Sequence, residues 1–170
     1  VYKRQTKPFD KGVSTTAILL GKTKLYEFAD NNKELKLRPS WHTHSGDVHL
    51  LKNFVSINSA LEVDLTGQVG AEELNGIPVS AIGGQPDLVR AAHRSNGGHA
   101  IIALPSSAKG GKFSRIVSKL SGPVTTARSD VDVIVTENGA ADLRGKDLGQ
   151  RKQALISIAA PNFQEDLMKS

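Results

Sequence analysis

The segment from residue 55 to residue 65 has the strictest hydrophobic pattern in the chain. Its large apolar residues all carry odd numbers: Val55, Ile57, Leu61, Val63 and Leu65. Side chains of an extended chain alternate between two faces, so a period of two predicts a strand with one buried face. Polar or small residues fill the even-numbered positions. By this pattern Glu62 and Asp64 belong to the polar face, where we expect them to be solvated.

Short strands and helices follow one another along the rest of the chain. Apolar runs bounded by Gly or Pro predict strands, and helices are expected where polar capping residues or Pro precede a periodic segment. We expect strands at 13–20, 35–37, 78–82, 100–104, 114–117, 124–126 and 131–136, and helices at 24–29, 88–93, 147–159 and 162–168. This mixture predicts an α/β domain. The chain of 170 residues can bury such a core without disulfides or metal.

Composition excludes several classes of protein. Cysteine is absent, which rules out a disulfide scaffold, a zinc–thiolate site and cysteine catalysis, and fits a reducing compartment. No apolar run approaches the roughly 20 residues of a membrane span. We therefore expect a cytoplasmic protein without a membrane partner. The 22 Lys and Arg against 17 Asp and Glu raise nucleic acid or an anionic ligand as a partner. An aromatic content of 5% is thin for a protein that binds single strands.

Residues 1–5, VYKRQ, lack apolar periodicity. In one reading frame, the end of a transposon adapter used in sequencing libraries would encode this string. We expect residues 1–5 to be an adapter-derived scar, which leaves residues 6–170 as the domain. The alternative is an ordinary basic arm. Without Lys3 and Arg4, 20 basic residues (22 − 2) face 17 acidic ones. Nucleic acid is then disfavoured as a partner.

Two glycine-containing segments are candidates for ligand binding. Gly83 and Gly84 follow a strand and lead into a helix, where free N–H groups suit a carbonyl oxygen that gains charge during a reaction. The alternative there is a tight turn alone. Residues 109–112, KGGK, lack the Ser or Thr that completes a Walker motif. Their lysines could still meet a phosphorylated ligand as point charges, or the loop could be a solvated hairpin tip.

Other candidate constellations are weaker. His42, His44 and His49 suggest a metal site, but no full ligand set accompanies them, and a solvated loop is favoured. A Ser-His-Asp triad could be drawn from His93 or His99, yet the sequence has no G-x-S-x-G elbow. We therefore assign no metal ligand.

Four segments together resemble the acetyl-CoA hydrolase/transferase family, which includes 4-hydroxybutyrate, butyrate and acetate CoA-transferases. They are residues 56–69 (SINSALEVDLTGQV), 83–87 (GGQPD), 101–112 (IIALPSSAKGGK) and 135–145 (VTENGAADLRG). They run in the family's order with close spacing, and the resemblance extends from about Lys7 to the end of the chain. It implies a CoA-transferase-like (NagB/RpiA-type) α/β fold, a layered sheet flanked by helices. It also implies that this chain is an incomplete second domain of a two-domain enzyme.

The activity implied by the resemblance is transfer of CoA between an acyl-CoA and acetate or another short-chain acid. In this family a glutamate attacks the acyl-CoA, and a glutamyl-CoA thioester forms. The segment with that glutamate should precede the part resembled by residues 13–28, so we expect it upstream of Val1. Glu62 belongs to a different family motif. We therefore expect no catalytic residue in this chain, and the chain alone should be inactive. We expect CoA to be a substrate and not a tightly bound cofactor.

The resemblance carries over few site residues. Gly84 matches the glycine whose backbone amide faces the thioester carbonyl, with Gly83 beside it. Ser80 and Lys109 match positions that contact CoA. The expected cofactor-binding residues are therefore Gly83, Gly84, Ser80 and Lys109. The segment from Trp41 to His49 departs from the family pattern and is either a variable loop or a part that tunes substrate choice.

Partners and alternatives follow from the same resemblance. The expected partners are an acyl-CoA, a short-chain carboxylate and the missing N-terminal domain of the same chain, with homo-oligomerisation left open. One alternative is an acetyl-CoA hydrolase, in which water accepts the acyl group. Another is a non-catalytic module that binds CoA or nucleic acid.

Overall fold

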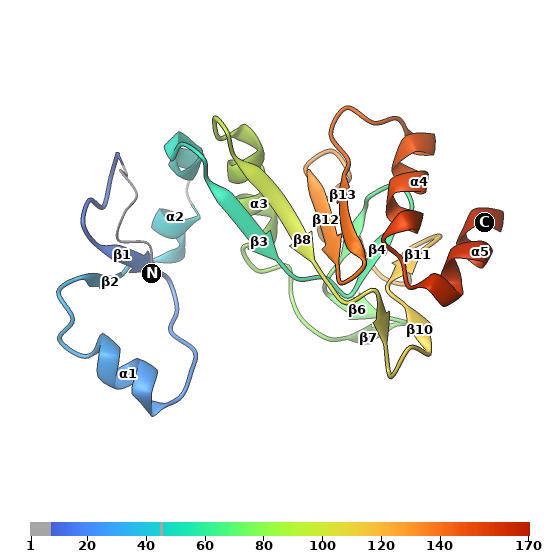
Figure 1. The fold of residues 1–170 in the computed structure, drawn as a ribbon. Helices are drawn as coiled ribbons and strands as arrows, with labels where there is room; N and C mark the ends of the chain where they lie inside the picture. The colour runs from blue at the N-terminus through green and yellow to red at the C-terminus, as the bar shows by residue number, and fades with distance from the viewer. Residues whose placement is uncertain (1–7, 45) are drawn as a thin grey trace.

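The computed structural model of the chain describes residues 8–44 and 46–170. The suspected adapter scar, residues 1–5, lies outside them. The first strands of the described residues are β1 (Ser14–Thr16) and β2 (Leu35–Leu37), which are short, parallel and joined through helix α1 (Thr23–Ala29). Helix α2 (Ser40–Thr43) and a 3₁₀ helix (Gly46–Leu50) follow. Figure 1 shows β1, β2 and α1 at one end of the molecule, far from the last helices.

The central sheet has four strands in the order β13-β12-β8-β3. Strands β3 (Val55–Asn58), β8 (His99–Ala103) and β12 (Val133–Thr136) are parallel, and β13 (Gly139–Asp142) is antiparallel to β12. Helix α3 (Gln85–Arg94) packs against β3 and β8. Parallel strands joined through a helix are typical of the α/β class that the sequence predicts.

A second sheet of three strands lies beside the first (Figure 1). It contains β4 (Glu62–Asp64) between β11 (Ile116–Val117) and β5 (Val69–Gly70). Two small hairpins accompany it: β6 (Glu73–Leu74) with β7 (Ile77–Pro78), and β9 (Ser107–Ala108) with β10 (Phe113–Ser114). Residues 124–126, expected as a strand, contribute only an isolated bridge between Val69 and Thr126.

Two helices complete the chain and pack against each other. They are α4 (Leu148–Ser157), which contacts β13, and α5 (Pro161–Lys169). Asp147 caps α4 as expected: its side chain accepts from the Gln150 amide, and the Gln150 side chain accepts from the Asp147 amide. No helix within the described ranges has the length and apolar character that crossing a bilayer requires.

One continuous core joins both sheets to the helices. Its large, fully buried side chains include Val63 of β4, Ile102 of β8, Ile116 of β11, Ile134 of β12 and Leu155 of α4. By contrast, the expected buried strand at 13–20 is only three residues long, and Ile18 and Leu20 are exposed. The core of the chain therefore lies in residues 55–170, and it is this part that positions the candidate site.

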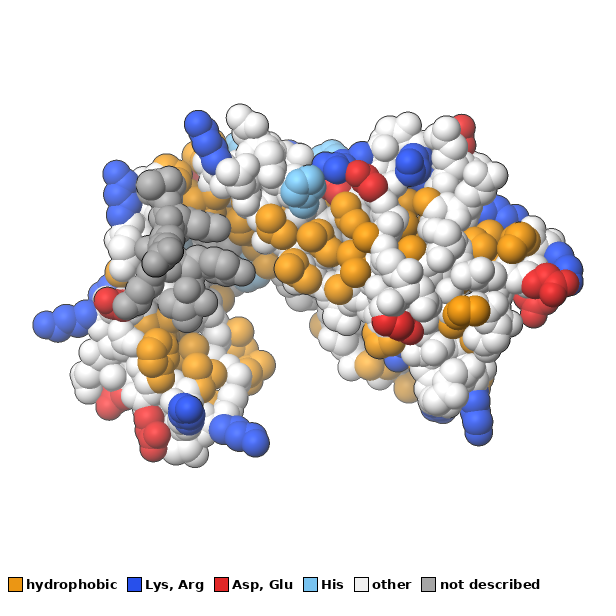
Figure 2. All heavy atoms as spheres, viewed as in Figure 1, with side chains coloured by type: hydrophobic (Ala, Val, Ile, Leu, Met, Phe, Trp, Pro, Cys, Tyr) orange, Lys and Arg blue, Asp and Glu red, His pale blue; other side chains and the backbone are white. Residues whose placement is uncertain are grey.

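The prediction that the odd-numbered residues of 55–65 form the buried face is wrong for β3, the first strand of this segment. In β3 the buried residue is Ser56, which is 5% exposed, whereas Val55 and Ile57 are 44% and 67% exposed. Helix α3 covers the face of the sheet that bears Ser56, where Ala100 and Ile102 are also buried. The opposite face stays partly open. We call it the open sheet face; it comprises Val55, Ile57, Ile101, Ala103, Val133 and Val135. Figure 2 shows the hydrophobic side chains gathered over these strands.

Candidate functional site

The Gly83–Gly84 turn connects the β6–β7 hairpin to helix α3. Gly83 has a φ of +58°, in the left-handed region that only glycine adopts without strain. Gly84 is the N-cap of α3, and its carbonyl accepts the Leu88 amide at 3.1 Å. The first amides of a helix have no partner within it. The structure therefore has the glycine turn before a helix that the sequence predicts, and a role of its N–H groups in ligand binding stays a prediction.

Gln85 fixes this turn to the second sheet. Its Nε2 donates to the Ser59 carbonyl at 2.8 Å, and its Oε1 accepts from Thr126 Oγ1 at 2.9 Å. The side chain is buried, at 9% exposure. The sequence analysis missed this residue, although a signal exists. Val89 and Ala92 follow Gln85 at four and seven positions, which places all three on the buried face of one helix.

A pocket of about 350 Å³ opens beside the turn. Ser80 and Gly84 both line it, so the structure brings together two of the four residues that the family resemblance selects. Gly83 lies in the same turn and is exposed. The remaining lining residues come from two segments, 58–61 and 79–85, together with Ala71. Several of them are apolar and exposed, among them Val79 and Ile82. The pocket can accept an apolar group next to backbone donors.

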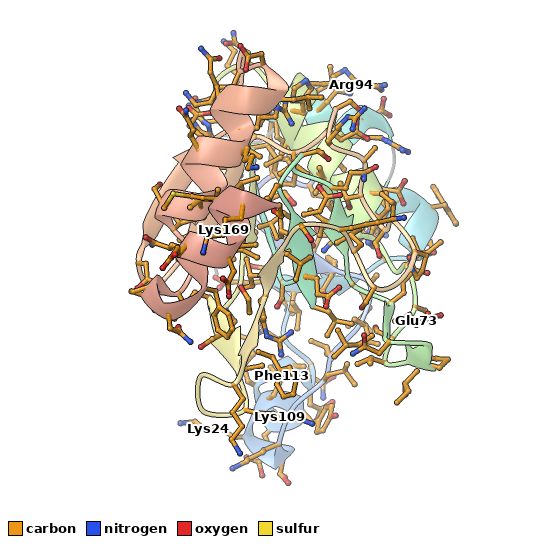
Figure 3. The ribbon with its side chains drawn as sticks, turned by 90° about the vertical axis from the view of Figure 1, so that its right-hand side faces the viewer. Lys24, Glu73, Arg94, Lys109, Phe113 and Lys169 are labelled. Carbon is orange, nitrogen blue, oxygen red and sulfur yellow. The ribbon has the colours of Figure 1, made fainter. Side chains whose placement is uncertain are left out.

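Lys109 lies elsewhere, at the tip of the β9–β10 hairpin, and does not line this pocket. Three consecutive residues there have left-handed backbone angles: Lys109 (φ 49°), Gly110 (68°) and Gly111 (85°). The Lys109 Nζ is 5.5 Å from the centre of the Phe113 ring, and Figure 3 shows the two side chains together at one end of the molecule. Such a loop offers an exposed cation that an aromatic ring holds in place.

The hairpin with Lys109 is tied to the central sheet by a carboxylate. Glu137 accepts from the Ser106 amide at 2.8 Å and from Ser106 Oγ at 2.5 Å. These two hydrogen bonds stabilise the charged form and hold the pKa of Glu137 below its usual value. Ser106 is 1% exposed. Two of the four resembling segments, 101–112 and 135–145, thus meet at one contact.

The histidine segment is more structured than the expected solvated loop. His42 and His44 are half-buried at α2. His42 Nε2 lies 2.7 Å from Asp10 Oδ2, and this hydrogen bond holds the pKa of the Asp10 carboxyl below its usual value. Within the described ranges, no three His, Asp or Glu side chains gather closely enough to hold a metal ion.

His44 contacts the glycine turn directly. A Cβ atom placed on Gly84 would lie 2.0 Å from His44 Nε2, so the imidazole occupies the space that any larger residue would need. His44 comes from the segment that departs from the family pattern. The sequence offers no signal for this contact, because the two residues lie 40 positions apart (84 − 44).

Glu62 and Asp64 are not solvated, which corrects the expectation from their alternating positions. Both are buried, at 9% and 3% exposure. Glu62 Oε2 accepts from the Ser121 amide and hydroxyl, each at 2.9 Å. Asp64 accepts from the amides and side chains of Thr66 and Gln68 at 2.7–3.0 Å. Carboxylates saturated in this way have a structural role, which agrees with the decision not to assign Glu62 as the nucleophile.

Comparison with known proteins identifies the family of the chain. The family model described as the acetyl-CoA hydrolase/transferase C-terminal domain matches residues 21–170. The chain belongs to the acetyl-CoA hydrolase/transferase family. Its expected α/β fold is likewise confirmed. The chain resembles the crystal structure of RipA from Yersinia pestis with a TM-score of 0.91 and 39% identity, covering 98% of this chain and 38% of that one.

Relatives within the family include several CoA-transferases. The chain is 44% identical to the 4-hydroxybutyrate coenzyme A transferase of Clostridium kluyveri, over 99% of this chain and 40% of that protein. It is 38% identical to the butyryl-CoA:acetate CoA-transferase of Anaerostipes caccae, over 96% of this chain and 38% of that protein. The chain thus spans about two fifths of the length of these relatives. The activity of the whole protein is therefore a separate question.

Proposed function

We propose that this chain is the C-terminal part of a cytoplasmic acyl-CoA:carboxylate CoA-transferase that uses acetate or another short-chain acid. The observation that carries the proposal is the Gly83–Gly84 turn. In a chain 44% identical to a 4-hydroxybutyrate CoA-transferase, it presents backbone donors at the mouth of a pocket that Ser80 also lines. Backbone donors beside an apolar pocket suit the carbonyl of a thioester, which gains negative charge when a nucleophile attacks it.

The proposed reaction needs a carboxylate nucleophile and an acyl-CoA. A glutamate oxygen attacks the thioester carbonyl carbon, the carbon–sulfur bond breaks, and CoA leaves as the thiolate. The thiolate then attacks the glutamyl carbonyl of the mixed anhydride, which releases the first acid and leaves a glutamyl-CoA thioester. The same two steps in reverse, with the second acid, complete the transfer. Gly84 would donate its N–H to the carbonyl oxygen whenever that oxygen carries charge.

Lys109 would bind the other end of the substrate. CoA is elongated, and its phosphate groups lie far from its thiol. A cation at a hairpin tip, away from the Gly84 pocket, is therefore compatible with one ligand that spans both places. Ser80 would contact CoA nearer to the thioester. In this assignment CoA is a substrate that enters and leaves, and not a resident cofactor.

We also propose that the nucleophilic glutamate belongs to a preceding part of a longer protein, and that residues 6–170 alone are inactive. Two observations support this. The relatives are about two and a half times as long as the stretch that they share with this chain. The open sheet face also leaves Val55 and Ile57 exposed. Apolar sheet faces are normally covered, so further chain from the same protein would fit there.

The reading frame upstream of Val1 tests the proposal. A longer frame with a glutamate in the expected segment supports it, and a complete longer frame without such a glutamate refutes the transferase assignment. The longer protein should form acetyl-CoA from butyryl-CoA only when acetate is added. Release of free CoA at the same rate without any acid would instead identify a hydrolase, an activity named for a relative from Kluyveromyces lactis that is 29% identical.

A binding module without catalysis is the remaining alternative. Titration with CoA and with a DNA oligonucleotide distinguishes it. DNA binding that weakens steeply with salt, in the absence of CoA binding, would favour a nucleic-acid module over the proposed enzyme.

A further inference from the structure

Within residues 8–44 and 46–170, strand β3 is an edge strand of the central sheet and pairs only with β8. The Phe54 carbonyl accepts the His99 amide at 3.1 Å, so the backbone groups of Phe54 face β8. In a strand these groups point to opposite sides at alternate residues, so those of Ser56 face β8 as well. The N–H and C=O groups of Val55 and Ile57 therefore face the outer edge of the sheet.

Strand β1 also pairs on one side, since β2 is its only partner strand in the described part of the chain. The Ser14 amide donates to the Glu34 carbonyl at 2.6 Å, and the Thr16 carbonyl accepts the Arg38 amide at 2.9 Å. Ser14 and Thr16 therefore face β2, and the peptide groups of Thr15 between them face the other way. Two strands alone make a marginal sheet, and parallel sheets are normally covered on both faces. We therefore expect β1 and β2 to belong to a larger sheet.

A cavity of about 410 Å³ lies between β1 and the start of β3. Its walls include residues 15–18, which continue from β1, and Leu51 and Phe54, which precede β3. Most of the lining is apolar, and Ile18 at its margin is 64% exposed. Figure 1 shows β1 and β2 beyond the β3 edge of the central sheet. The space between the two sheets is thus suited to an apolar segment with backbone groups to pair on both sides.

One added parallel strand between β1 and β3 would join the two sheets into one. Strands β1 and β2 would then follow each other outward on one side of it, and β3, β8 and β12 outward on the other. If the added strand comes first in the chain, this is the 3-2-1-4-5-6 order of the doubly wound α/β fold. The described residues supply the second to sixth strands of that order. The strand that completes it must therefore precede β1.

We propose that the gap between β1 and β3 binds one parallel strand from the part of the longer protein that precedes this chain. We call this gap the strand slot; it comprises residues 15–18, Val55 and Ile57. The proposal rests on the proposed function in one respect, namely that a longer protein exists. The relatives are about two and a half times as long as the stretch that they share with this chain, so enough chain is available. Thr15 on one side, and Val55 and Ile57 on the other, would pair with the backbone of the added strand.

The strand slot has a consequence for the Gly84 pocket. Strand β3 ends at Asn58, and Asn58 and Ser59 both line the pocket that contains Ser80 and Gly84. Doubly wound sheets bind ligands beyond the carboxyl ends of their strands, where the strand order reverses. In the completed sheet this point lies between the added strand and β3. The residues that follow the added strand would therefore lie beside the Gly84 pocket.

Amide hydrogen exchange of the longer protein tests the proposal, measured residue by residue by mass spectrometry. We expect the Val55 and Ile57 amides to exchange at least about 10²-fold more slowly than in an unstructured peptide. The Ser56 amide is the positive control, because it faces β8 in any case. The Ala140 amide is the matched negative control. It points away from β12, since the Leu143 amide three positions on donates to the Asp132 carbonyl and neighbouring residues alternate.

Each outcome of this measurement bears on the strand slot. Val55 and Ile57 amides that exchange as fast as that of Ala140 would overturn the proposal, and CoA transfer by the same protein would leave the proposed function intact. Protection that disappears when the protein is diluted to a monomer would assign the edges to a second copy, which also overturns it. So would equal protection in the 170-residue chain without its upstream part. Protection that persists on dilution, in a longer protein without transferase activity, would support the strand slot and refute the proposed enzyme.

Discussion

Replacement of Gln85 by Met should loosen the turn that presents Gly84. Met has nearly the same length and shape as Gln but cannot form either hydrogen bond. The Ser59 carbonyl loses a donor at 2.8 Å, and the Thr126 hydroxyl loses an acceptor at 2.9 Å. Thr126 is 2% exposed, so water cannot readily replace the lost partner.

The size of the effect follows from these two lost contacts. A buried polar group without its partner costs about 1–3 kcal/mol. The Thr126 hydroxyl bears most of this cost, because the Ser59 carbonyl belongs to an exposed residue and can recover water. The apolar Met side chain gains about 1 kcal/mol from its own burial. We expect the free energy of unfolding to fall by about 1 kcal/mol, and the urea midpoint by about 0.5 M.

Equilibrium urea unfolding followed by far-UV circular dichroism measures this change. Q153M is the matched control, because Gln153 is exposed on α4 and the same substitution there should change stability by less than about 0.5 kcal/mol. A Q85M protein as stable as Q153M would show that the two hydrogen bonds do not hold the turn. The explanation for the position of Gly84 would then be wrong.

Three further predictions concern other parts of the molecule. D147A should lower stability by about 1 kcal/mol in thermal or urea unfolding, and D147S should retain most of it, because Ser also caps a helix. The hydrogen bond to His42 lowers the pKa of Asp10 in the folded protein. The ionised Asp10 side chain therefore stabilises the fold at any pH above the pKa of Asp in the unfolded chain, about 3.9. This stabilisation is lost as the pH falls through the lower pKa of the folded protein. Wild type should therefore lose more stability than D10N between pH 5 and pH 2; parallel losses would contradict this. In the longer protein, K109A should weaken CoA binding by about threefold to tenfold and reduce its salt dependence, measured by calorimetry, whereas K169A on α5 should change neither.

The helices could be predicted because their signals are local. Pro86 near the first turn of α3, Asp147 before α4 and Pro161 at the start of α5 mark three of the observed helix starts. Each acts through the backbone of its own turn, so no distant contact is needed to interpret it. Even there, α3 begins three residues before the expected start at Leu88.

The faces of the strands could not be predicted in the same way. The period of two in residues 55–65 shows that side chains alternate, but what covers each face depends on elements far along the chain. Helix α3 covers the side of Ser56, which leaves Ile57 on the open sheet face. In β4 both faces are covered, so Glu62 and Asp64 are buried and need partners. Those partners come partly from Ser121, 59 positions away.

The site shows the same division between local and distant information. The glycine pair was selected for the close approach of a ligand, and the family resemblance gave it a role. Neither argument includes His44, yet its ring already fills the place of a Gly84 side chain. Two physical reasons then account for glycine at position 84: in the proposed function a thioester approaches its amide, and in the structure an imidazole lies against its Cα. If only the first reason applied, G84A would weaken activity without moving the ring. Because both apply, we expect G84A to displace His44 as well, which would appear as a shift of the His44 side-chain signals in the isolated chain, with no substrate present.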